Sequence, residues 1–310
     1  MATQLRHTYT IAIFVRISIS EERVDYLTAD VFATGDNTLA ASSNLYLVLG
    51  GVYPERDVLS RLDHLVILIR DLDRAVRDYE TLGFTVTPGG EHADGLTRNA
   101  LIPFRDGSYL ELVAFLDPDD PRDNIWGWRP FLSSGGGLID YCVASDDLRA
   151  DVRRLESLGF GVEGPTDGGR RLPDGEEIRW RTARIHQNGR LLPFLVEDLT
   201  PRSLRVPNGP SAAHQNGAVG ISRLEVAVPD AEGAARSFDA LTGTDLEVSL
   251  RLGACELSLV ASEDDEARRR LDAAGPGPLA VELATVASEG AEKLDRRLSH
   301  GVDIVLLRQE

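Results

Sequence analysis

The chain has 310 residues, 42% of them hydrophobic and 27% charged, which is the composition of a globular protein with one large domain or two ordinary ones. Fifty acidic against 33 basic side chains give a net charge of −17, which argues against binding to nucleic acid or to an anionic membrane surface. No apolar run approaches the roughly 18–20 residues that span a bilayer, so we expect no membrane segment.

The first 57 residues match nothing in the rest of the chain, and we expect them to be a poorly ordered extension, although residues 8–20 are compatible with a strand. The short apolar stretch near the start lacks a small-residue cleavage site and is a poor signal peptide. The two cysteines, Cys142 and Cys255, are too few for a disulfide framework. These features indicate a cytoplasmic protein.

A repeat runs through the remainder of the chain. In each copy, a residue in an apolar run is followed seven positions later by an aspartate and eleven positions after that by a leucine. The three residues are His64, Asp71 and Leu82 in the first copy, Asp140, Asp147 and Leu158 in the second, and Arg223, Asp230 and Leu241 in the third. A weaker fourth copy begins near Ala280 and is cut short.

Each copy predicts the same order of elements. The apolar run is a buried strand, the aspartate is the N-cap of an amphipathic helix, and a glycine at 83 or 159 ends that helix. Further strands follow, at 101–105 and 109–115 in the first copy and at 178–185 and 191–196 in the second. We therefore expect an α+β fold of four βαβββ units, the last one truncated.

The linkers divide these units. Residues 58–200 are expected to form one domain of two units, residues 201–217 a linker, and residues 218–310 the third unit with the truncated fourth. A second linker, at 116–136, carries Trp126 and Trp128, which suggest a lid or an interface.

Two ionisable residues lie on strands that are otherwise apolar. Glu111 shares a face with Tyr109, Val113 and Phe115, where a carboxylate costs several kcal/mol unless it is paired or bound to metal. His64 lies in the middle of the first strand of its unit, and a lone histidine there is ordinarily a core residue with its hydrogen bonds satisfied.

Six motifs in order carry a family resemblance. They are Leu62-Asp-His64-Leu-Val, Gly89-Gly90-Glu-His92 with Thr97-Arg-Asn99, Ser108-Tyr-Leu-Glu111, Gly164-Pro165, Arg171-Leu-Pro-Asp174-Gly175 with Trp180, and Pro193-Phe194-Leu-Val. Over residues 60–262 the sequence resembles the vicinal oxygen chelate superfamily and, within it, the glyoxalase-like domain proteins. The resemblance implies curved mixed sheets in which two βαβββ units form one cup. The superfamily includes lyases, isomerases, dioxygenases, antibiotic-binding proteins and catalytically empty members.

The resemblance also implies a metal site. His64 and Glu111 occupy two positions that the superfamily uses for metal ligands, which favours a metal-facing pair over two core residues. Asp140 is the second-unit equivalent of His64 and a candidate oxygen ligand. The equivalent of Glu111 falls near Pro193, which cannot ligate, so the pattern departs from a four-ligand site.

His92 is a further candidate ligand, because it recurs with Asn99 in the glyoxalase-like relatives. Together with His64 and Glu111 it would form a set of two histidines and one carboxylate with open positions. Alternatively, His92 is a loop residue that hydrogen-bonds Asn99 or a carboxylate. Arg171 and Trp180, with Asn99, are candidate substrate-binding residues. For Trp180, packing in the core is an equally good interpretation.

The second half of the chain is expected to have no metal site and no catalytic role. Arg223 and Ala280 occupy the His64 position there, and Ser258 occupies the Glu111 position, so no metal site can be assembled. We expect this half to complete the fold or to form the surface of a homodimer.

These observations predict a cytoplasmic lyase, isomerase or dioxygenase that uses a divalent metal (Mn, Fe, Co, Ni or Zn) and acts on a small oxygenated metabolite. The metal would bind two neighbouring substrate oxygens, while Glu111 or a nearby carboxylate moves a proton. The alternatives are a metal-free protein that binds a drug or metabolite in the same cup, and a structural homologue without a ligand.

Overall fold

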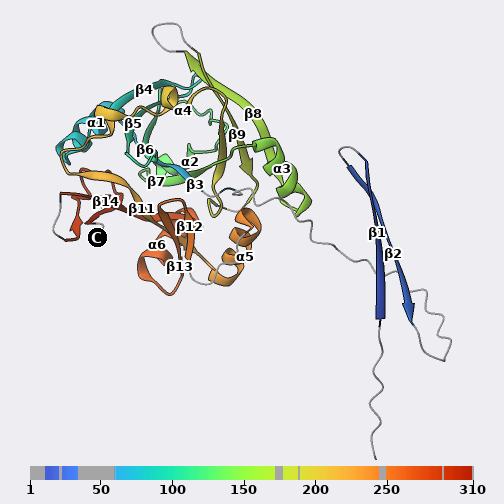
Figure 1. Cartoon of the computed structure of the whole chain (residues 1–310). Helices are drawn as coiled ribbons and strands as arrows, with labels where there is room; N and C mark the ends of the chain where they lie inside the picture. Colours follow the sequence, from blue (N-terminus) through green and yellow to red (C-terminus); the bar gives the residue numbers. More distant parts are fainter. Residues whose placement is uncertain are drawn as a thin grey trace, which may run out of the picture. The chain divides into compact units, whose positions relative to one another are not determined.

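The computed structural model describes residues 11–20, 23–33, 59, 61–171, 177–187, 189–243, 249–287 and 290–308 (Figure 1). It divides the chain into two units, residues 1–53 and 54–310. In the first unit β1 (Ile11–Ser20) pairs with β2 (Arg23–Ala33) as an antiparallel hairpin. The other residues up to 58 lie outside the described part, so poor order over 1–57 stays a prediction.

The first two repeats form one eight-stranded mixed sheet. Its order is β4 (Thr87–Glu91), β5 (Thr97–Pro103), β6 (Tyr109–Phe115), β3 (Arg61–Leu68), β7 (Gly137–Ala144), β10 (Phe194–Asp198), β9 (Glu177–Ile185) and β8 (Val162–Arg171). β3 is parallel to β6, β7 is parallel to β10, and β3 and β7 meet antiparallel at the centre. This two-fold pattern confirms the α+β fold of repeated βαβββ units.

The helices begin where the sequence predicts. α1 (Leu72–Thr81), α3 (Leu148–Ser157) and α5 (Ala231–Thr242) are each preceded by an aspartate whose carboxylate accepts a backbone N–H of the first turn. Such a side chain satisfies a donor that the helix itself leaves without a partner. Gly83 and Gly159, just beyond α1 and α3, have φ of +88° and +91°, which side chains rarely allow.

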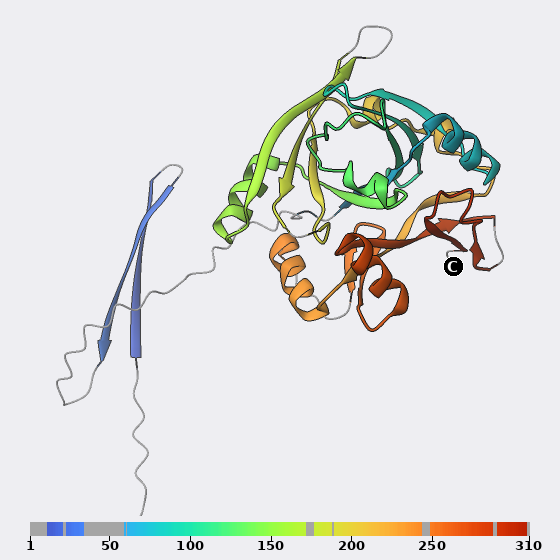
Figure 2. The ribbon, with the colours of Figure 1, turned by 180° about the vertical axis from the view of Figure 1, so that it is seen from behind.

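The two faces of the curled sheet differ. Leu65 and Ile67 of β3 belong to the main core, which also includes the buried faces of α1 and α3 on the outside of the curl (Figure 2). Val66 and Leu68 point the other way and pack in a second cluster with Trp128, from the segment before α2 (Pro130–Ser133). Because strand side chains alternate, His64 shares the inner face with Val66 and Leu68.

The second half contains a six-stranded sheet. Its order is β12 (Ser249–Leu252), β13 (Cys255–Ala261), β11 (Ala218–Val228), β14 (Gly277–Thr285), β16 (Asp303–Arg308) and β15 (Glu292–Lys293). α6 (Asp265–Ala274) lies between β13 and β14 in the chain. Val66 and Glu225 are equivalent positions of the repeat, and they lie opposite Glu111 and Ser258 on the neighbouring strands. Ser258 therefore occupies the Glu111 position of the second half.

The segment between the halves carries structure of its own. It contains α4 (Arg202–Arg205) and the short 3₁₀ helix η1 (Gly209–Ala212), followed by His214. The His214 ring accepts the Thr85 N–H at 3.0 Å and donates to the Pro103 carbonyl at 2.9 Å, which attaches the segment to the first half. Among the described residues, no helix is long and apolar enough to cross a membrane.

Candidate functional site

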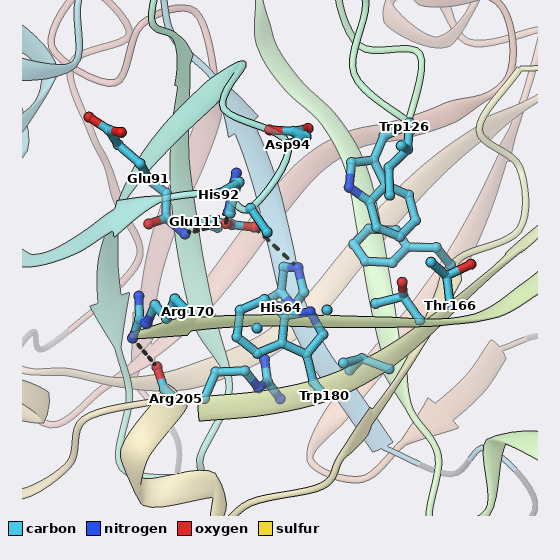
Figure 3. A pocket seen from close by; sticks show the side chains of 18 of the residues that line it. His64, Glu91, His92, Asp94, Glu111, Trp126, Thr166, Arg170, Trp180 and Arg205 are labelled. Atoms are coloured by element: carbon cyan, nitrogen blue, oxygen red, sulfur yellow. Dashed lines mark hydrogen bonds and ion pairs between the residues drawn. The ribbon is translucent and has the colours of Figure 1, made fainter. Parts of the chain in front are cut away.

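A cavity of about 330 Å³ lies on the inner face of the eight-stranded sheet (Figure 3). One side is polar, with His64 on β3, Asn99 on β5, Glu111 on β6 and His92 just after β4. The other side is largely aromatic and comes from β9, β10 and the segment before α2. The cavity therefore holds both anomalous residues of the sequence, His64 and Glu111.

His64 is buried and held from both sides. Its Nδ1 lies 2.7 Å from Asp63 Oδ1, and because a carboxylate accepts, Nδ1 carries the proton. Its Nε2 lies 3.3 Å from Glu111 Oε2. The ring also stacks on Tyr109 at 4.5 Å between centroids. Burial lowers the pKa of His64, but Asp63 and Glu111 outweigh burial and raise it above its usual value.

Two arginines from the segment after β10 hold Asp63 in place. Arg205 donates to both carboxylate oxygens, at 3.1 and 3.0 Å, and Arg202 also bonds Oδ2. Burial raises the pKa of Asp63, yet Arg205, His64 and Arg202 bring it well below the usual range. The sequence alone does not single out these three residues, although Asp63 is a charged residue on a strand that is buried on both faces.

Glu111 is 6% exposed and lies between the two histidines. Asn99 Nδ2 donates to its Oε1 at 2.5 Å, and His92 Nε2 lies 3.3 Å from the same oxygen. Burial raises the pKa of Glu111, but its contacts with His64 and His92 prevail and lower it. The carboxylate is therefore ionised at neutral pH.

His92 and Asn99 are brought together by a turn and a glycine. The turn after β4 lets His92 Nδ1 meet Thr97 Oγ1 at 2.6 Å, which leaves Nε2 for the carboxylate. A Cβ added to Gly89 would stand 1.9 Å from Asn99 Oδ1, so a larger residue would displace this side chain. The motif that pairs Gly89 and His92 with Asn99 thus has a direct geometric reason.

The chemistry of these donors fits a cation. With His64 neutral and its proton on Nδ1, the Nε2 lone pair and the Glu111 carboxylate face each other as acceptors. Either a proton or a metal ion between them removes the repulsion. Two histidines and a carboxylate with open positions are a set that divalent transition metals accept, and Asp63 supplies the outer carboxylate that commonly orients a ligating histidine.

The fit requires some movement. The donor atoms of His64, His92 and Glu111 are not all within 4.8 Å of one another, so these side chains would move closer together around a shared ion. Among the described residues, Asp63, His64 and Cys142 do meet that spacing. They are the poorer site, because Arg205 and Arg202 already pair with Asp63 and burial raises the pKa of the Cys142 thiol well above its usual value.

The structure does not bring Asp140 into this group, which corrects our expectation of a ligand there. Its Oδ2 accepts from Trp128 Nε1 at 2.9 Å and pairs with Arg190 at 3.3 Å. Burial raises the pKa of this carboxyl group against the effect of Arg190. Asp140 therefore anchors Trp128. In the β7–β10 register the residue equivalent to Glu111 is Phe194, one position beyond Pro193, and it also cannot ligate.

The other predicted residues divide as follows. Trp180 lines the cavity, as do Trp126 and Trp128 from the 116–136 linker. The side chain of Arg171 and all of Asp174 lie outside the described residues, so the role proposed for Arg171 stays a prediction. Its neighbour Arg170 lines the cavity.

Comparison with known protein families identifies a domain type for this chain. The family model described as glyoxalase-like domain matches residues 62–242. No curated protein matches the sequence.

Two solved structures with TM-scores above 0.5 show the same fold. A hypothetical protein of Staphylococcus aureus superposes with a TM-score of 0.62 at 14% identity, covering 80% of this chain and 99% of its own. A mutant of 4-hydroxymandelate synthase from Streptomyces coelicolor has a TM-score of 0.52 at 17% identity, over 73% of this chain and 71% of its own. Methylmalonyl-CoA epimerase from Mycobacterium tuberculosis is 28% identical over 48% of this chain and 94% of its own, with a TM-score of 0.37.

Proposed function

The chain belongs to the glyoxalase-like domain family of the vicinal oxygen chelate superfamily, and we propose that it is a divalent-metal-dependent enzyme acting on a small oxygenated metabolite. One observation carries the proposal. The Nε2 atoms of His64 and His92 each lie 3.3 Å from an oxygen of the buried Glu111 carboxylate, inside a cavity with room for a ligand.

His64, His92 and Glu111 would hold the ion, which is manganese, iron, cobalt, nickel or zinc by the chemistry of its ligands. A bound ion would supply Lewis-acid polarisation of substrate oxygens. Asp63 fixes the orientation of the His64 ring, and Arg205 fixes Asp63. Glu111 or a nearby carboxylate would move a proton of the substrate, as lyase and isomerase chemistry requires.

Metal content tests the proposal. Protein purified without a histidine tag should contain about one divalent ion per chain, and a chelator should lower its melting temperature. Full restoration of the melting temperature by one metal would identify the ion. Absence of metal, with melting unchanged by chelator and by added ions, would contradict the proposal.

A metal-free small-molecule-binding protein is the second candidate. It is favoured by the contacts of Glu111, whose charge already has two histidines and the Asn99 amide as partners. In this case a ligand would bind the chelated protein as tightly as the untreated protein. The cytoplasmic location that we propose in both cases is supported by two cysteines that are buried and free.

A further inference from the structure

We propose that the ligand of this cavity carries an aromatic ring and a carboxylate, with the ring against tryptophan side chains and the carboxylate at Arg170. This inference names the ligand class of the site and so rests on the proposed function for its setting. Its two supports are the distribution of tryptophan in the chain and the charge of Arg170.

All three tryptophans of the 310-residue chain line this one cavity. Trp126 and Trp128 are stacked with ring centroids 5.8 Å apart, and Trp126 also contacts Phe194 at 4.5 Å. Trp128 is 2% exposed and fixed through its bond to Asp140, so it serves as the base of the aromatic wall. Trp126 is half-buried and presents its ring to the cavity (Figure 3).

Trp180 reaches the same cavity from β9. It lies opposite Gly168 of β8, and a Cβ added to Gly168 would stand 2.6 Å from the indole Nε1. The glycine therefore leaves room for the indole to lie across the neighbouring strand. Aromatic pairs in offset or edge geometry gain about 0.5–1.5 kcal/mol beyond the burial of their area, so indoles around a small cavity favour an aromatic guest. A volume of about 330 Å³ is at the small end for a ligand pocket and suits a single ring.

Arg170 supplies a positive charge to the lining of the cavity. Its guanidinium donates to the carbonyls of Gly89 at 2.7 Å and Arg205 at 3.1 Å, and its Nε has no partner. No described carboxylate forms an ion pair with it. Arg205, by contrast, pairs with Asp63 and Asp198. In a chain of net charge −17, Arg170 is therefore the cation in this cavity that an anionic ligand can engage.

Among the acidic residues at the cavity, the buried Glu111 carboxylate attracts the Arg170 charge without pairing with it, and its own oxygens are held by two histidines and Asn99. Glu91 and Asp94 are exposed to water, where solvent screens them. Asp167 is exposed and bonded to Arg181 at 2.7 Å. The carbonyls of Gly89 and Arg205 meanwhile hold the Arg170 guanidinium in one position, so little side-chain freedom is lost when a carboxylate binds.

The test uses matched probes and the intrinsic fluorescence of the full-length protein. Benzoate, benzamide and cyclohexanecarboxylate are titrated while tryptophan emission is followed, first with chelator present and then with metal added. Because every tryptophan lines the cavity, binding should quench the signal. We expect benzoate to bind at least about tenfold more tightly than benzamide, since a hydrogen bond to a charged group exceeds a neutral one by this much. Benzoate should also bind more tightly than cyclohexanecarboxylate.

Variants locate the anion. Arg170→Gln should make benzoate and benzamide equal, and Arg170→Lys should keep part of the preference. Arg98→Gln, on β5 and paired outside the cavity with Asp73, should behave as wild type. An undiminished preference in folded Arg170→Gln would overturn the inference, as would weak binding of all three probes to wild type. Preference for benzoate in a protein that binds no metal would uphold this inference while the metalloenzyme proposal failed.

Discussion

Replacing Glu111 by glutamine separates metal binding from folding. In the metal-free protein, glutamine keeps the length of the side chain and an oxygen for the Asn99 N–H, and its amide nitrogen can donate to the His64 Nε2 lone pair. We therefore expect the free energy of unfolding without metal to change by no more than about 1.5 kcal/mol. Metal affinity should fall much more, because the carboxylate is the one negative ligand of the set.

The expected magnitude follows from linkage. Free metal at a hundredfold excess over the dissociation constant stabilises the wild type by about 2.7 kcal/mol. If Glu111→Gln weakens affinity about a hundredfold, the same metal concentration equals the new dissociation constant and stabilises by about 0.4 kcal/mol. The difference of about 2.3 kcal/mol corresponds to about 5–9 °C in melting temperature for a domain of this size.

The assay compares melting temperatures with chelator and with metal for wild type, Glu111→Gln and Ser258→Ala. Ser258 is the matched control, because it occupies the Glu111 position of the second half and is also buried. Wild type and Ser258→Ala should show the full metal-induced shift. A full shift in Glu111→Gln would refute the assignment of the site to the first half, and loss of the shift in Ser258→Ala would place it in the second.

Three further predictions concern the surroundings of the site. Asp140→Ala should lower stability by about 3 kcal/mol, because the Arg190 charge loses its carboxylate and a buried indole N–H loses its acceptor. Metal content should not change, and loss of metal would restore Asp140 as a ligand. A chain lacking residues 1–57 should unfold cooperatively in circular dichroism, because residues 54–310 form their own compact unit; an unfolded product would show that the segment is needed. Burial lowers the pKa of His214 in the folded protein, so as the pH falls the histidine is protonated first in the unfolded chain. The contribution of neutral His214 to stability should therefore be complete above about pH 6.5 and decline as the pH falls below this value. His214→Asn should weaken this acid-side loss in urea titrations, and an identical pH profile would contradict the role of the ring.

Much of the fold could be predicted from the sequence because each repeat is marked by interactions between residues that are close in the chain. The aspartates at 71, 147 and 230 cap helices through short-range hydrogen bonds, and the strands are dense in apolar residues. α6 escaped prediction although Asp264 caps it, because the repeat has no helix at that point. The sequence of residues 201–217 indicates only a linker, since the contacts of His214 are with residues more than a hundred positions away.

The site was predicted where its residues were chemically out of place on their own strand. Glu111 and His64 stood out in this way, and the structure places them 3.3 Å apart. Asp140 had the same appearance, yet its partners are Trp128 and Arg190, which no local pattern relates to it. Arg205 was missed for the same reason, because it reaches Asp63 from 142 positions along the chain.

Elemental analysis of the untagged wild-type protein, after dialysis against metal-free buffer, tests the central claim most directly. The contacts of His64 and His92 with the Glu111 carboxylate predict about one transition-metal ion per chain, removed by a chelator together with several degrees of melting temperature. Far less than one ion per chain, in protein whose melting temperature responds neither to chelator nor to any added divalent ion, would contradict it.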